Sequence, residues 1–152
     1  MADSGSERFT VFVNYDDPRW GKFDSGHYDC HLHPDFAVAH FPSNDHGLAK
    51  VIMCYVTPDP ANLTDARKAL SEIKQLGLRR PDRAEAEMFF EQYPEEQNKF
   101  PIIALCGSIV GDGVDRRVAY ISAHNDEFAV GEVKLGRDGF LKYRFLAVRK
   151  SV

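Results

Sequence analysis

The order of its strand-like and helix-like segments is the feature that most constrains the fold of this chain. Segments in which apolar and polar residues alternate, as they do in β-strands, lie in the first and last thirds of the sequence. Residues 62–93 instead carry apolar residues at helical spacing. Because strands and helices are grouped rather than alternating, this order predicts an α+β domain built on an antiparallel sheet.

We expect about seven strands, three before the helical region and four after it. The first three cover residues 8–15, 27–41 and 48–57, and the last four cover residues 100–110, 116–124, 127–135 and 140–150. The turn sequences "GDG", "ND" and "GRDG" separate the last four strands, which favours an antiparallel meander. The predicted sheet is strongly curved, with a partly closed barrel as an alternative.

Two consecutive helices are predicted between the third and fourth strands. Asn62 is the expected N-cap of the first helix, and Gly77 is its expected stop. The second helix is expected to begin at Asp82, with Glu85 as its capping-box partner, and to end by Pro94. Because both helices have an apolar stripe, we expect them to cover one face of the sheet.

Length and composition limit the classes of function. The 152 residues are 43% hydrophobic, which fits a single domain over residues 1–152 with a frayed segment at 1–7. The formal net charge of −4 disfavours nucleic acid as a partner. No apolar run approaches the roughly 20 residues that cross a membrane, and the first residues lack the pattern of a secretory signal, so we expect a cytosolic protein.

The histidines gather in one segment of the sequence. Five of the six fall within residues 27–46, where even spacing would place about 0.8. In an extended strand, His31 and His33 point to the same side about 6.6 Å apart, so two imidazoles can bind one ion. We therefore expect a candidate site for zinc or another divalent metal, with His27 and the distant His124 as further ligands.

A metal site of this kind would support hydrolysis. A bound zinc ion acidifies its water ligand, and a neighbouring carboxylate can then act as a general base. Asp29 and Asp35 occupy the same alternating positions as the histidines and are the candidate catalytic residues. On this interpretation the chain is a small metal-dependent hydrolase.

The same residues also fit a protein without catalytic activity. Alternating histidines are equally typical of the solvent-facing side of a strand. Aromatic and charged side chains of the segment around Trp20 then form a ligand or partner surface, with Arg19, Tyr28, His40 and His46 as its other candidates. The simplest interpretation is a small cytosolic ligand- or partner-binding module with a histidine-rich surface, and the sequence leaves open whether the chain is an enzyme. A third alternative is a pH-sensitive interface, because exposed histidines gain charge between about pH 7 and 5.5.

Overall fold

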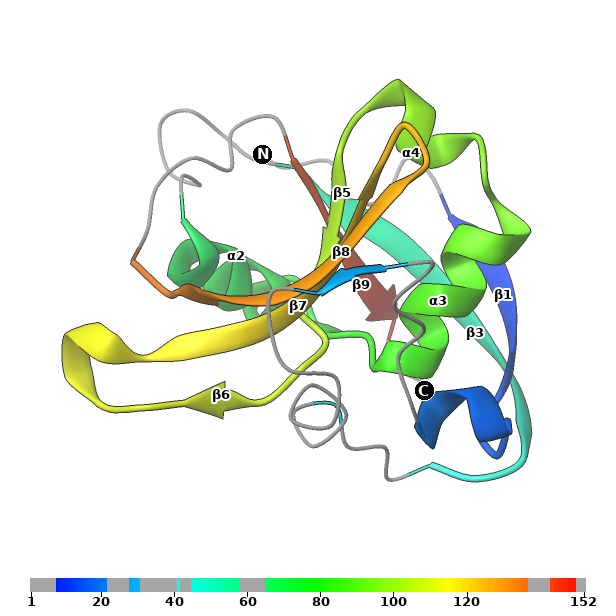
Figure 1. Cartoon of the computed structure of the whole chain (residues 1–152), viewed down its shortest axis with the longest axis horizontal. Coiled ribbons are helices and arrows are strands. Elements are labelled where there is room, and N and C mark those ends of the chain that lie inside the picture. The colour runs from blue at the N-terminus through cyan, green and yellow to red at the C-terminus, as the bar shows by residue number, and fades with distance from the viewer. Residues whose placement is uncertain are drawn as a thin grey trace.

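A computed structural model describes residues 8–21, 28–30, 41, 45–57, 65–136 and 143–149 of the chain, with the backbone alone for 28–30. Within this part the protein is a mixed α+β fold, and all nine strands belong to one sheet. All pairs are antiparallel except two, β2 with β8 and β5 with β9. The predicted class and the mostly antiparallel sheet are therefore confirmed (Figure 1).

The sheet follows the order β1-β3-β9-β5-β7-β8-β2, with β4 added beside β9 and β6 beside β7. The strands are β1 (Phe9–Asn14), β2 (Tyr28–Cys30), β3 (Leu48–Val56), β4 (Leu78–Arg79), β5 (Ile102–Ala104), β6 (Ile109–Val110), β7 (Arg117–His124), β8 (Glu127–Lys134) and β9 (Arg144–Arg149). The path ends at β1 and β2, which do not pair with each other in the described ranges. The sheet is thus open, and the barrel alternative is wrong.

The last strand departs from the predicted meander. β9 does not pair with β8 but lies between β3 and β5, antiparallel to the first and parallel to the second. Its residues 145–148 are all buried. A strand with apolar residues on both faces requires a central position, where both faces are covered, and the hairpin signals did not reveal this.

The helical elements are α2 (Ala66–Gln75), α3 (Arg83–Gln92), α4 (Glu96–Lys99) and the short 3-10 turns η1 (Pro18–Gly21) and η2 (Gly113–Asp115). Between β3 and β5 the described chain contains α2, β4, α3 and α4, so the short strand β4 lies between the two longer helices. Asp65, not Asn62, is the N-cap of α2, and its side chain accepts a hydrogen bond from the Lys68 amide. Gly77, with φ of +74°, follows the helix in the left-handed conformation that glycine favours. α3 begins with the predicted capping box of Asp82 and Glu85.

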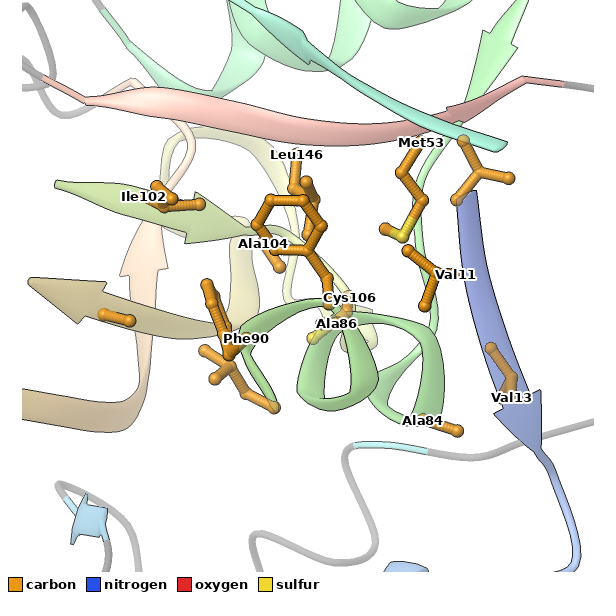
Figure 2. Close-up of a cluster of buried hydrophobic side chains, with 14 of the residues drawn as sticks. Val11, Val13, Met53, Ala84, Ala86, Phe90, Ile102, Ala104, Cys106 and Leu146 are labelled. Carbon is orange, nitrogen blue, oxygen red and sulfur yellow. The ribbon is translucent and has the colours of Figure 1, made fainter. Parts of the chain in front are cut away.

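α2 and α3 cover opposite faces of the sheet, not one face as predicted (Figure 1). We call the face covered by α3 the inner face, to which alternate strand residues such as Val11, Met53 and Leu146 belong (Figure 2). The face covered by α2 is the outer face, to which Cys54 and Ala147 belong. Because the central strands are apolar on both sides, each face needs its own helical cover. None of the described helices has the length and apolar character needed to cross a lipid bilayer.

Candidate functional site

Most of the predicted metal site lies outside the described residues. His27, His31, His33, His40 and Asp35 all fall in segments that the structure does not describe. Tyr28 and Asp29 belong to β2, for which the backbone alone is described. The prediction that these residues gather around a metal ion is therefore neither confirmed nor wrong.

The sheet does place β2 in relation to His124. Tyr28 pairs with Phe128 of β8, and His124 ends β7 opposite Glu127. β8 thus separates the two strands, and their backbones are about 10 Å apart. The His124 ring is exposed, with Nε2 3.3 Å from Asn125 Nδ2. Among the residues with described side chains, no three histidine, cysteine or acidic side chains are grouped so as to hold a metal ion.

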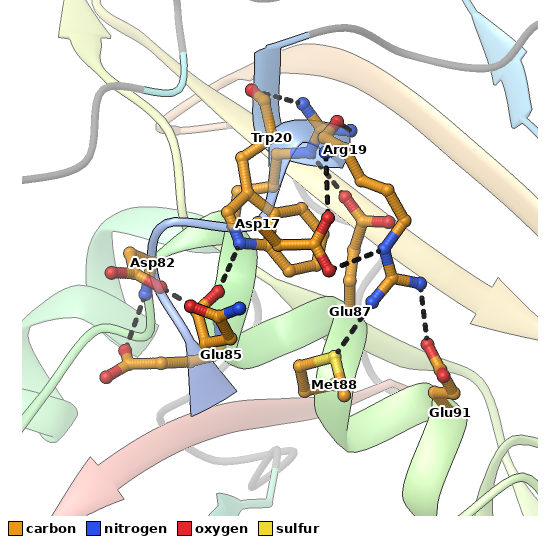
Figure 3. Close-up of polar contacts among 10 residues, drawn as sticks. Asp17, Arg19, Trp20, Asp82, Glu85, Glu87, Met88 and Glu91 are labelled. Carbon is orange, nitrogen blue, oxygen red and sulfur yellow. Dashed lines mark hydrogen bonds and ion pairs between the residues drawn. The ribbon is translucent and has the colours of Figure 1, made fainter. Parts of the chain in front are cut away.

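Arg19 and Trp20, two candidates for a partner surface, make contacts within the fold. The indole Nε1 of Trp20 donates to the Asn14 carbonyl oxygen at 2.8 Å. The guanidinium carbons of Arg19 and Arg83 lie 5.0 and 5.6 Å from the centroid of the Trp20 ring. Arg19 also donates to Asp17 and Glu91 (Figure 3). His46, the remaining described candidate, is exposed, with Nδ1 3.3 Å from Asp16 Oδ1. These contacts hold the η1 turn against α3, so less of the Trp20 ring is available for contact with a partner.

A buried carboxylate of α3 joins β4 and Tyr15, the residue that follows β1, on the inner face. Glu85 is fully buried and accepts two hydrogen bonds from Arg79, at 2.9 and 2.7 Å, and one from the Tyr15 hydroxyl at 2.7 Å. Burial alone would raise the pKa of Glu85, but the hydrogen bonds from Arg79 and Tyr15 outweigh it and hold the pKa below its ordinary value. This bidentate pair holds the N-terminus of α3 against the sheet.

Two neighbouring groups have raised pKa values. Burial, and then the charge of Glu85, raise the pKa of Asp82 to about 6. Burial likewise raises the pKa of the Cys106 thiol, which therefore stays protonated and is a poor nucleophile. Buried side-chain nitrogen and oxygen atoms in the described ranges all have hydrogen-bond partners. The cluster is therefore a satisfied structural network.

Side chains close the free edge of β1. Gln92 accepts from the Phe12 amide at 3.0 Å and donates to the Phe12 carbonyl oxygen at 2.7 Å, as a neighbouring strand would. The Tyr93 hydroxyl donates to the Thr10 carbonyl oxygen at 2.8 Å, and the indole Nε1 of Trp20 donates to the Asn14 carbonyl oxygen. Since these outward-pointing groups are already bonded, a partner strand cannot easily add to this edge.

The outer face of β1 and β3 is exposed beyond α2. Phe12 and Leu48 are 61% and 83% exposed, whereas neighbouring inner-face residues are buried. Phe12 lies directly opposite Lys50, with Leu48 and Ile52 on either side of Lys50 in β3. α2 contacts the outer face farther along β3, at Cys54 and Val56. This bare face, composed of Phe12, Leu48, Lys50 and Ile52, is the candidate functional site, which we call the outer patch.

Sequence reasoning missed the outer patch, although one signal was present. In "FTVFVN", the alternation places Phe12 in phase with Thr10 and Asn14 rather than with the core residues. A large aromatic residue on the polar side of a strand needs a specific explanation. Comparison of the chain with family models, curated proteins and solved structures finds no match.

Proposed function

We propose that this chain is a small, non-catalytic binding module that binds a protein partner through the outer patch. The observation that carries the proposal is the exposure of Phe12 and Leu48, which lie diagonally across β1 and β3. Single exposed apolar residues are ordinary on protein surfaces, but large ones grouped on one rigid face are typical of interaction sites. Aromatic side chains also supply much of the binding energy of interfaces.

The patch is well prepared for binding because its backbone is fixed on both sides. β1 pairs with β3 along its whole length. On the other edge of β1, the Gln92 side chain makes two hydrogen bonds to the Phe12 backbone. Side chains on such a backbone lose little further freedom when a partner docks, which lowers the entropic cost of association. We therefore expect a partner to bind the existing surface rather than remodel it.

Site-specific photocrosslinking tests this function. A photoreactive phenylalanine analogue at position 12, in cells expressing the full chain, is expected to form adducts that a Leu48→Glu substitution removes. The matched control places the same analogue at Ser71, an exposed residue of α2. Identical adducts from positions 12 and 71, or adducts at position 12 that survive Leu48→Glu, would show that the outer patch is not a binding site.

The proposal also covers where the protein is located and whether it catalyses a reaction. A cytosolic location is part of this proposal. The alternative, a metal-dependent hydrolase using His31 and His33, predicts bound zinc or another divalent metal in protein purified without a histidine tag. Stoichiometric metal that is lost in a His31→Ala, His33→Ala double variant would favour the hydrolase, and a metal-free protein that fails to bind added zinc would remove it.

A further inference from the structure

We propose that the partner segment bound by the outer patch is an acidic amphipathic helix, an inference that depends on the proposed function. Lys50 lies in the middle of the patch, with its Cβ atom about 5 Å from that of Phe12 across the strand pair. Arg149 follows Val148, which pairs with Met53, so Arg149 lies next to Ile52. Arg8 immediately precedes β1. Apolar and cationic side chains are thus interspersed on one surface.

No ion pair neutralises these three cations within the part of the chain that the structure describes. Strands β1, β3 and β9 contain no acidic residue. Among the described residues, none of the ion pairs involves Arg8, Lys50 or Arg149. All three are exposed.

The elements on the other side of the sheet are different. Arg19 of η1, Arg79 of β4 and Arg83 of α3 each pair with a carboxylate of α3. The whole chain also carries a net charge of −4, so unpaired cations around an apolar patch do not reflect a general excess of positive charge. A complementary partner therefore presents carboxylates around an apolar stripe.

The backbone geometry favours a helix over an added strand as the bound segment. Gln92, Tyr93 and Trp20 already bond the outward groups of β1, so recognition must use the face of the strands and not their edge. Leu48 and Ile52 are the diagonal neighbours of Phe12 across the strand pair, and such residues are typically about 7–8 Å apart. This spacing suits the apolar i, i+4 side chains of a helix, which are about 5–6 Å apart and splay outward.

A membrane surface fits the same charges less well. Apolar anchors of peripheral membrane proteins must reach about 5–10 Å into the lipid. Phe12 and Leu48 project from the same strand pair as Lys50 and next to it, so they cannot enter the lipid without burying that charge as well. A helical protein segment can instead place a carboxylate next to Lys50.

An unbiased peptide selection tests the inference. Random displayed peptides of about 16 residues, long enough to form a helix, are selected against the immobilised full chain and then depleted against Phe12→Glu. Enriched peptides are expected to combine Asp and Glu with Leu, Ile or Phe at i, i+3 and i+4 spacing. Their affinity, measured by fluorescence anisotropy, is expected to fall about tenfold or more in Lys50→Glu, Arg149→Glu. The matched charge change Lys68→Glu, Arg116→Glu, outside the patch, should change it less than about twofold.

Every other outcome overturns the inference. Such outcomes are no enrichment on the wild-type chain, enriched peptides without acidic residues, or equal affinity for Lys50→Glu, Arg149→Glu. Patch-dependent binding to vesicles with about 30% phosphatidylserine, or to single-stranded DNA, without acidic peptides would assign the patch to another anionic ligand. If position 12 still forms specific adducts in cells while the peptides lack acidic residues, only the partner chemistry is wrong. If those adducts are absent, the proposed function fails as well.

Discussion

The two faces of β1 and β3 are built from the same strands but differ in what covers them. On the inner face, Phe9 packs edge-to-face against Tyr55, Phe89 and Tyr93, with ring centroids 4.9–5.3 Å apart. On the outer face, three residues along the same strand, Phe12 is 61% exposed. Phe9 is needed for the fold, whereas no packing in the described part of the chain accounts for Phe12. A large exposed apolar side chain that the fold does not require indicates an interaction site.

The largest effect is expected from comparing two phenylalanines of the same strand. Phe9→Ala should lower the free energy of unfolding by about 3–5 kcal/mol, because it opens a cavity among packed aromatic rings. Phe12→Ala should lower it by less than about 1 kcal/mol, since its ring is mostly in water. Urea denaturation measures both values. Equal losses would mean that the outer patch is part of the core after all.

The buried carboxylate gives the next largest effect. Glu85→Gln keeps the shape of the side chain but leaves the Arg79 charge without its counter-ion, so we expect a loss of about 2–4 kcal/mol. Glu91→Gln removes the exposed partner of Arg19 and should cost less than about 1 kcal/mol. Thermal and urea unfolding compare the two variants. If Glu85→Gln is as stable as Glu91→Gln, the inner-face network does not support the fold as described.

Titration of Asp82 should make the inner face sensitive to pH. Its pKa is about 6 in the folded protein and about 4 in an unfolded chain, so the folded state binds the proton more tightly. Stability from this group is therefore present at low pH and is lost as pH rises from about 4 to about 6, by about 2–3 kcal/mol. Asp82→Asn retains a capping side chain and lacks this loss. The difference in unfolding free energy between variant and wild type should thus shift in favour of the variant from pH 4 to pH 7, and a constant difference would contradict the assignment.

The smallest effect is expected at the free edge of β1, where Gln92 bonds the Phe12 backbone. Gln92→Ala removes both hydrogen bonds to the Phe12 backbone and should cost about 1 kcal/mol. It also exposes a strand edge, so self-association measured by light scattering should increase. Gln75→Ala, which removes an exposed amide on α2, is the matched control and should change neither quantity. Gln92→Ala protein that stays monomeric would show that Gln92 does not protect the edge.

Local sequence signals predicted local structure well. The capping box of Asp82 and Glu85 follows from residues three apart, and Gly77 marks the end of α2 because of its backbone conformation. The arginine that pairs with Glu85 was not predicted, because Arg79 is in β4 and its partner is chosen by packing. Likewise, alternation assigned Phe12 to the polar side of β1 but did not reveal that α2 stops short of it. Which segment covers which face is a tertiary property that a single sequence does not encode locally.

The central position of β9 also affects how the chain folds during synthesis. Residues 144–149 are the last of the nine strands to be made, yet they pair with both β3 and β5. Until they emerge from the ribosome, the β1–β3 ladder and the β5–β7–β8 ladder lack the strand that joins them. Pairing of β9 is therefore the step that joins the two ladders into one sheet, and the long sequence separation between β3 and β9 favours slow folding.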